Sequence, residues 1–513
     1  MNAKLSSLKS HFLNWREWEF NPIVIKELRQ SVRSWTVTGM LLLFLTVMFI
    51  TSLGFLVSQS FDGNPNQELG GAIFQTFVGI LTFSSVIFIP LYLGIRIAVE
   101  RMDSNPDLLY ISTLTPGSII RGKFFCGAYM AVLFFSACLP FMAFTNLLRG
   151  VDLPTVFFIL ICLFLIVCAV NMLAIFLACL PMSRPFRILI ALYGLGQSVM
   201  IIFPLVFASY RMTQSGIGAM MASPSFWLTF LTYGAIGLSV VGLLYFLSVA
   251  LISPPSANRA RPLRLYITAM WFLGGLVSVV WVAHEGNSQL MLPWAVYSLV
   301  MMTISTLVTI SNQDQLSLRV RSKIPQAGMK RIVAFIFFNG AAGGFIWVAS
   351  ISIITFLSTI AVASLITGSS SGPGGFQNEF THVFPAVMAY VFAYALTALL
   401  IHRKFLAKRP PKIAGILMVL LAGLWAIAPG IVLFFLNKLS WTTMEGLQLG
   451  NVFNVLSMRD EAGRNSHLIF ALGWLFVMVL LNARWFIRQF KNFRPLQRDA
   501  LPPVITETTA ISK

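Results

Sequence analysis

Long apolar runs separated by short polar segments are the main feature of this chain's hydropathy pattern. Twelve runs are long enough to cross a membrane as a helix, which requires about 20 apolar residues. They lie at 36–58, 72–99, 124–147, 155–181, 187–209, 225–252, 265–284, 289–311, 341–367, 382–402, 413–436 and 467–488. The apolar stretch around the ninth run begins near Arg331 and is interrupted by glycines within 340–344. We therefore expect a short approach helix before the ninth span.

The composition indicates that lipid is the solvent for most of the surface. Hydrophobic residues make up 57% of the 513 residues and charged residues only 10%, whereas a soluble domain is roughly 25% charged. So few charges could not cover a soluble globule, and no polar segment is long enough to form a large soluble catalytic domain. We therefore expect an all-α polytopic membrane protein with about twelve transmembrane helices.

The basic residues alternate with the predicted spans. The formal net charge is +19, and if the N-terminus is cytoplasmic, 31 of the 36 Lys and Arg residues lie on the cytoplasmic side. The positive-inside rule describes this distribution, and a single missing span would invert every later segment. We predict twelve spans in the inner (cytoplasmic) cell membrane with both termini in the cytoplasm. The positive charge then reflects topology, and we expect no nucleic-acid partner.

Two sequence landmarks recur in the same order in the two halves of the chain. The segment 184–187 (RPFR) recurs as 409–412 (RPPK), and a proline follows inside each span at the same spacing of 225 residues. Earlier in each half, 124–127 (FFCG) recurs as 337–340 (FFNG), 213 residues later. The Ser/Gly/Pro-rich stretch 368–379 accounts for the difference as an insertion. Because six is even, the pattern predicts two degenerate six-helix repeats in parallel orientation.

These patterns divide the chain into four parts. Residues 1–35 form a cytoplasmic or interfacial amphipathic segment, residues 36–253 and 254–488 form two six-span units, and residues 489–513 form a polar cytoplasmic tail.

Residues that usually carry metal or nucleotide chemistry are not arranged for it. The five cysteines lie in apolar runs without a CxxC pair, and the five histidines form no HExxH motif. Gly117–Lys123 has the GxxxxGK spacing of a phosphate-binding loop, but Phe124 stands where magnesium coordination needs Ser or Thr. No strand precedes this motif. We predict no catalytic, metal-binding or cofactor-binding residue in this chain.

The segment between spans 2 and 3 has the pattern of a short amphipathic helix. Pro106 can begin it with Asn105 as its cap, and Pro116 ends it. Its apolar positions are Leu108, Leu109, Ile111 and Leu114. A soluble partner could bind such a helix at the cytoplasmic surface, and an ordinary interfacial helix on lipid headgroups has the same spacing.

A second amphipathic segment precedes span 1. Asn21 can cap it and Pro22 can open it, and its apolar positions recur at helical spacing at Val24, Leu28, Val32 and Trp35. The residues predicted to face away from this stripe are Lys26, Glu27, Arg29 and Arg33. We predict a helix that lies in the plane of the inner leaflet.

These two segments resemble a known family. Asn21–Gln30 is similar to the opening of permease subunits of ATP-binding-cassette (ABC) exporters of the second type. The segment 100–123 resembles that family's signature after its second span, above all at Leu108-Leu109, 112–116 and Gly122-Lys123. The resemblance covers residues 20–250, while the matching segment of the second half, 311–331, lacks the Leu-Thr-Pro and Gly-Lys pattern.

The resemblance implies a fold, a partner and a function. Family members usually carry six spans and pair as dimers, so this chain resembles two such units fused as a pseudo-dimer. A separate soluble ATPase would hydrolyse ATP, and the chain itself would be no enzyme. Its cargo would be hydrophobic, lipid-linked, polysaccharide or drug-like.

The resemblance also suggests roles for particular residues. The residues expected in the coupling to the ATPase are Glu100, Asp107, Leu108, Leu109, Leu114 and Pro116. The in-plane helix would contain Pro22, Lys26, Glu27, Leu28 and Arg29. The polar residues Asn171 and Gln197 within spans are candidates for the substrate pathway, and hydrogen bonding between helices is the alternative role for each.

Two other classes of membrane protein are alternatives. A secondary transporter would be expected to bury charged residues in mid-span for ion coupling, and the predicted spans are nearly free of Asp and Glu. A membrane-embedded glycosyltransferase would need acidic residues in its first outside loop. That loop contains Asp62 and Glu68, but no paired carboxylates.

The predicted topology can be tested by thiol labelling. Cysteines introduced singly at Asn64, Ser370 and Gly450 should react with an impermeant thiol reagent added outside intact cells. A cysteine at Ser322 should be protected until the cells are opened. Labelling of the Ser322 position in intact cells would reverse the predicted orientation.

Overall fold

Every regular element in the described part of the chain is a helix. The computed structural model describes residues 22–62, 69–103, 115–148, 151–180, 184–215, 217–254, 256–312, 316–367, 375–436, 448–458 and 460–495. Twelve helices in these ranges are long and apolar enough to cross a membrane. The chain is therefore a multi-pass membrane protein, as predicted.

The chain folds into two compact units, Met1–Ser253 and Pro254–Lys513. The helices of the first unit are α2 (Pro22–Val32), α3 (Trp35–Asp62), α4 (Leu69–Asp103), α6 (Pro116–Leu147), α7 (Leu153–Cys179), α8 (Arg184–Ser215), α9 (Ile217–Met221) and α10 (Pro224–Ile252).

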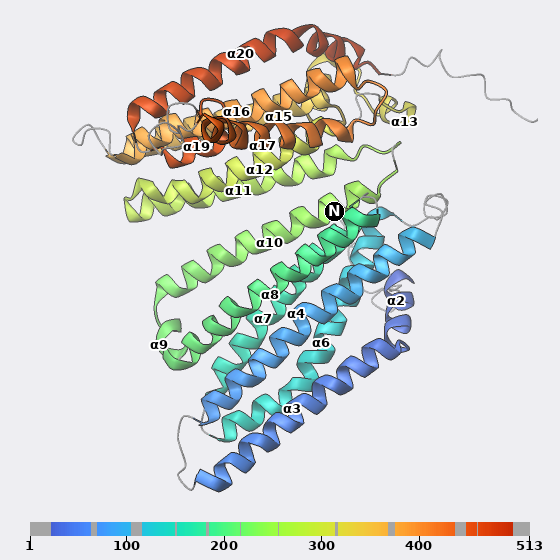
Figure 1. Ribbon diagram of the computed structural model, residues 1–513, viewed down its shortest axis with the longest axis vertical. Coiled ribbons are helices and arrows are strands. Elements are labelled where there is room, and N and C mark those ends of the chain that lie inside the picture. The colour runs from blue at the N-terminus through green and yellow to red at the C-terminus, as the bar shows by residue number, and fades with distance from the viewer. Residues whose placement is uncertain are drawn as a thin grey trace, which may run out of the picture. The chain divides into compact units, whose positions relative to one another are not determined.

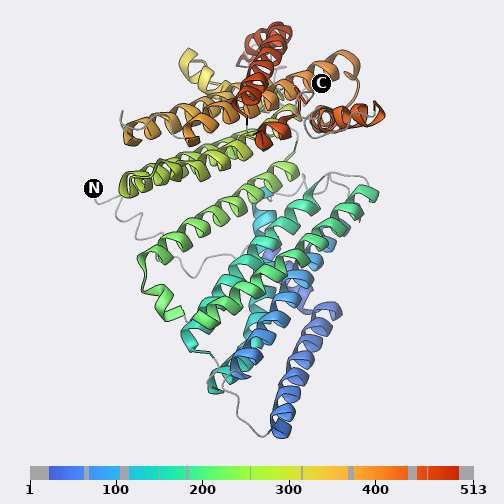
Figure 2. The same ribbon diagram turned by 60° about the vertical axis from the view of Figure 1, so that its left-hand side comes forward.

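The first unit is built around α4. This helix packs against α6, α7 and α8, and the long helices lie side by side in Figures 1 and 2. Phe44 and Phe134 join α3 to α6 with ring centroids 5.3 Å apart. On the outer surface, Trp35 is 84% exposed and Phe203 is 70% exposed. Such apolar exposure fits a surface that faces lipid.

The second unit is built around α16. Its helices are α11 (Ala260–Glu285), η2 (Ser288–Met291), α12 (Leu292–Ile310), α13 (Leu318–Arg321), α14 (Gly328–Phe337), α15 (Ala341–Thr367), α16 (Gly375–Phe405), α17 (Lys412–Phe435), α19 (Val452–Ser457) and α20 (Glu461–Asn492). α16 packs against α12, α15, α17 and α20. Its Tyr390 and Tyr394 are almost fully buried.

Most helices extend beyond the predicted apolar runs because polar residues continue them. α6 begins at Pro116, eight positions before the predicted start of the third span, and the Thr115 hydroxyl accepts a hydrogen bond from Ser118 N as its cap. α20 begins at Glu461 after Asp460, whose side chain accepts a bond from Gly463 N.

The ninth span is preceded by a separate approach helix, as the glycine cluster predicted. α14 ends at Phe337 and α15 begins at Ala341. Gly340 lies between them with φ +136°, a conformation that favours glycine. A Cβ on Gly343 would overlap the carbonyl oxygen of Phe335, so glycine is required there by close approach as well.

A buried arginine on α11 caps this break. Arg264 Nη1 donates to the carbonyl oxygens of Ile336 and Phe338, both at 2.7 Å, and Nη2 donates to the carbonyl of Gly340 at 3.0 Å. Arg264 is 2% exposed. Its guanidinium therefore satisfies carbonyls that the end of α14 leaves without helical partners.

The two units have similar element orders, but one proposed landmark differs in local structure. A short helix lies between the fifth and sixth spans in each unit, α9 in the first and α19 in the second. Residues 124–127 lie inside the continuous helix α6, whereas residues 337–340 form the break between α14 and α15. The repeat and the membrane topology remain predictions.

One of the labelling positions must be replaced. Gly450 has φ +103°, and a Cβ there would lie 2.5 Å from the Trp425 ring, so a cysteine would strain the fold. Phe453 on α19 is 59% exposed and serves the same topological test.

We predict that Arg264→Met destabilises the second unit. The substitution leaves the carbonyl oxygens of Ile336 and Phe338 without the arginine donor, whereas Gly340 O still accepts from Gly344 N, and an unsatisfied buried acceptor costs about 1–3 kcal/mol. The purified chain in detergent should melt at a clearly lower temperature. Arg261→Met removes an exposed arginine from the same helix and should leave the melting temperature unchanged. Equal melting of the two variants would contradict the capping role.

Candidate functional site

The in-plane segment forms helix α2, but its buried side differs from the prediction. Glu27 is 4% exposed and Ser31 is also buried, whereas Val32 is 59% exposed. The prediction that Glu27 faces away with Lys26 and Arg29 is therefore wrong. A single helical wheel sorts side chains by polarity and does not reveal a distant partner that can neutralise a buried carboxylate.

The rest of α2 agrees better with the predicted helix. Pro22 is its first residue, and Leu28 packs against the core of the first unit. Lys26 and Arg29 are exposed. Figures 1 and 2 show α2 turned away from the direction of the long helices where α3 begins.

The partner of Glu27 is Lys123 on α6. Lys123 Nζ lies 3.1 Å from Glu27 Oε1 and 2.5 Å from Glu100 Oε2 on α4. Lys123 is 7% exposed. One buried ammonium group therefore joins three helices by bonding two carboxylates that would otherwise repel each other.

Further polar side chains surround Lys123, Glu27 and Glu100. Arg96 Nη1 donates to the Tyr92 hydroxyl at 2.9 Å, and Arg96 Nη2 donates to Gln30 Oε1 on α2. Arg96 Nε lies 4.0 Å from Glu27 Oε2. At the exposed edge, Lys26 Nζ lies 3.8 Å from Glu100 Oε1. We call Lys26, Glu27, Arg96, Glu100 and Lys123 the ion-pair cluster.

The ion-pair cluster accounts for the apparent phosphate-binding motif. Gly117–Lys123 forms the first turns of α6 rather than a loop. The N–H groups of Ser118 and Ile119 donate to Thr115, and those further along bond within the helix, so they are not arranged as a loop around a phosphate. The Lys123 ammonium bonds two carboxylates, so the lysine of this motif has a structural role.

The predicted coupling residues are only partly within the described ranges. Asp107, Leu108, Leu109 and Leu114 lie in 104–114, outside the described residues. Glu100 lies near the end of α4, and Pro116 is the first residue of α6. The ion-pair cluster thus connects the two helices that flank the predicted coupling segment.

The two pathway candidates are not brought together. Asn171 on α7 is fully buried next to Gly127, and its side-chain atoms make no hydrogen bond to any residue in the described ranges. Gln197 on α8 is exposed. The alternative role for each was a hydrogen bond between helices. Neither side chain makes such a bond with a residue in the described ranges.

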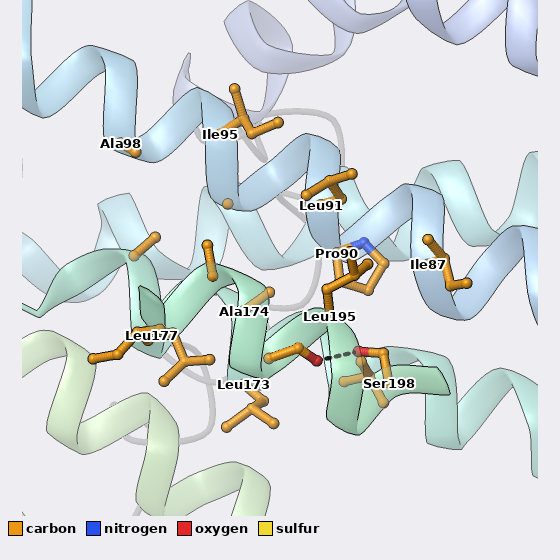
Figure 3. Close-up of a pocket in the computed structure, with 16 residues that line it drawn as sticks. Ile87, Pro90, Leu91, Ile95, Ala98, Leu173, Ala174, Leu177, Leu195 and Ser198 are labelled. Carbon is orange, nitrogen blue, oxygen red and sulfur yellow. Dashed lines mark hydrogen bonds between the residues drawn. The ribbon is translucent and has the colours of Figure 1, made fainter. Parts of the chain in front are cut away.

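An apolar groove lies between α4, α7 and α8. It encloses about 760 Å³, part of it open to the surroundings. Figure 3 shows Pro90 and Leu91 of α4, Leu173 of α7 and Leu195 of α8 around it. Its polar side chain is Ser198, whose hydroxyl donates to the carbonyl of Gly194 at 2.9 Å. The groove can therefore hold an apolar group but offers little to orient a polar one.

Sequence reasoning missed Lys123 and Arg96 as members of the site. A usable signal was the scarcity of acids: only 17 Asp and Glu occur in 513 residues. An acid such as Glu27 or Glu100 next to an apolar run requires a partner, and a basic residue at the end of a neighbouring span is the natural one.

We predict that Lys123 and Glu27 are energetically coupled. Lys123→Met removes the 3.1 Å partner of the buried Glu27 and leaves Arg96 Nε at 4.0 Å, which should cost about 3–5 kcal/mol. The double variant Lys123→Met/Glu27→Gln should be clearly less destabilised than the sum of the two single variants, as measured by unfolding in detergent.

The matched control is the longer pair of the exposed Lys26 with the half-buried Glu100, 3.8 Å apart. Its double-mutant cycle should give a coupling below about 1 kcal/mol. Equal coupling in the two cycles would contradict the assignment of Lys123 and Glu27 as the centre of the ion-pair cluster.

Comparisons of the chain with protein-family models, with curated proteins and with solved structures found no match.

Proposed function

We propose that this chain is the membrane permease of an ATP-driven exporter of the ABC type, working with a separate soluble ATPase subunit. The observation that carries the proposal is the connection of α2, α4 and α6 by Lys123. Such a permease needs the segment between its second and third spans to be held by a rigid base.

The ion-pair cluster can provide that base. The segment 104–114 leaves α4 shortly after Glu100 and enters α6 shortly before Lys123. A force applied to this segment reaches both helices, and because Lys123 bonds Glu100 and Glu27, the ends of α4, α6 and α2 move as one body. The ATPase would thereby act on several helices through one contact.

The apolar groove is consistent with a hydrophobic cargo. Its walls come from α4, α7 and α8, and α4 also carries Glu100 of the ion-pair cluster. Motion of α4 would therefore change the width of the groove. This links the proposed site of force with a surface that can hold an acyl or other apolar group.

A secondary transporter fits less well. Within the described ranges, the buried acid is Glu27, which lies on α2 outside the twelve long helices. Ion coupling through a carboxylate would require an acid buried within a span. A glycosyltransferase would need acidic residues at the first outside loop, where Glu68 lies outside the described residues.

The two units would act together as a fused pseudo-dimer. In the second unit, the segment that corresponds to the coupling segment contains the short helix α13. A buried cation of this unit is Arg264, which bonds backbone carbonyls. We propose that the first unit provides the principal contact with the ATPase.

Leu109→Asp tests this function. If Leu109 enters an apolar groove on the ATPase, an ionised carboxylate there loses its hydration, and a loss of about 2.7 kcal/mol weakens association a hundredfold. The variant should insert normally, while co-purification of an ATPase and transport-linked ATP hydrolysis should both fall sharply.

The second unit offers a comparison. Leu316 packs against the core of that unit, so Leu316→Asp would disturb folding. Leu318 on α13 is 67% exposed, and Leu318→Asp should have a smaller effect than Leu109→Asp. If Leu109→Asp folds and keeps its ATPase at wild-type occupancy, the segment is only an interfacial anchor and the proposal is wrong.

A further inference from the structure

A basic cleft lies at the ends of α16 and α20 in the second unit. It encloses about 1350 Å³, part of it open to the surroundings. Its basic lining comes from the end of α16, the connection to α17 and the end of α20, namely Arg403, Lys404, Arg409 and Arg488, with His402 beside them. None of these residues belongs to the ion-pair cluster.

The floor of the cleft is held in place by neighbouring groups. Arg403 Nη1 donates to Asn482 Oδ1 at 3.0 Å, and the Arg403 guanidinium lies 5.0 Å from the centre of the Trp485 ring. Asn482 is itself fixed, because its Nδ2 donates to the carbonyl of Met478 at 2.8 Å. His402 Nε2 lies 3.2 Å from the carbonyl oxygen of Arg409. The cleft is thus a preformed concave surface rather than a flexible basic loop.

The cations on its rim have no acidic partner in the described part of the chain. Lys404, Arg409 and Arg488 are exposed, and no carboxylate in the described ranges lies within ion-pair distance of their side chains. A surface lysine or arginine is usually surrounded by water. Here Lys404, Arg409 and Arg488 line the same cleft. An anion in the cleft would be bound by several charge-assisted hydrogen bonds.

The cleft also has an apolar wall. Leu400 of α16 and Pro411 line it beside the cations and are half-buried, and the buried Leu399 and Ile310 lie behind them. A small hydrophilic anion gains nothing from contact with apolar side chains. An amphiphile with a charged head and acyl chains can contact both the cations and the apolar side chains. The predicted topology puts this end of α16 at the cytoplasmic leaflet, where anionic lipids concentrate.

We propose that the cleft binds a phosphate-bearing anion, namely the headgroup of an inner-leaflet phospholipid. The phosphate sits against Arg409 and Arg488 above Arg403, and the acyl chains follow Leu400 and Pro411. This site is independent of the proposed exporter function, because it requires only a membrane with anionic lipid.

Native mass spectrometry of the purified full-length chain tests the site. Cardiolipin should be retained in a saturable stoichiometry, and zwitterionic phosphatidylcholine should not. In Lys404→Gln/Arg409→Gln/Arg488→Gln the affinity for cardiolipin should fall about tenfold or more. Arg403 is left intact because it packs against Trp485.

A variant of equal charge is the control. Lys408→Gln/Lys412→Gln/Lys491→Gln removes three exposed basic residues that do not line the cleft. This variant should keep most of the affinity. An equal loss in both triple variants would show diffuse surface attraction and overturn the proposal.

Two further outcomes would also overturn it. If inorganic phosphate at millimolar concentration displaces cardiolipin, the cleft binds a soluble phosphate compound rather than a lipid. Asp314 lies outside the described residues, two positions after Asn312 in the cleft lining. If the Asp314→Asn variant binds lipid and the unaltered chain does not, the Asp314 carboxylate neutralises the cleft.

Discussion

The first unit depends on one ammonium group shared by two carboxylates. Removing an ion from water costs several kcal/mol, so Lys123 and Glu27 can be buried only together. Glu100 completes the arrangement from α4 at 2.5 Å, and Arg96 limits the negative charge that remains. A shift of α2 or α6 would separate Glu27 from Lys123 and leave a buried charge without its nearest partner. Electrostatics here fixes the relative positions of helices that apolar packing alone would allow to slide.

In the second unit, separate elements are joined by different bonds. A buried cation again joins separate elements, but Arg264 bonds three backbone carbonyls and no acid. The planar guanidinium can reach several carbonyls at once, which the compact ammonium of a lysine does less well. The joint in the first unit therefore depends on side-chain charges, whereas that in the second depends on the backbone geometry at the break between α14 and α15. The two units have similar element orders, but their helix ends respond to different perturbations.

The sequence predicted the helices because each span must present a continuous apolar surface to lipid. It predicted the interruption of the ninth span from glycines, which reveal backbone conformation locally. It did not predict where helices end, since Thr115 and the polar turns up to Lys123 extend α6 outside the apolar run. It also put Glu27 on the wrong side of α2. Contacts such as Glu27–Lys123 join residues 96 positions apart, and no local periodicity records them.

The distance in sequence between Glu27 and Lys123 has a consequence for biosynthesis. α2 leaves the ribosome before α3, α4 and the start of α6, so Glu27 reaches the membrane surface long before its partner exists. Until the third span begins to insert, the carboxylate must remain hydrated, because burying it alone is too costly. We therefore expect α2 to bury Glu27 only once Lys123 has been synthesised, after α3 and α4.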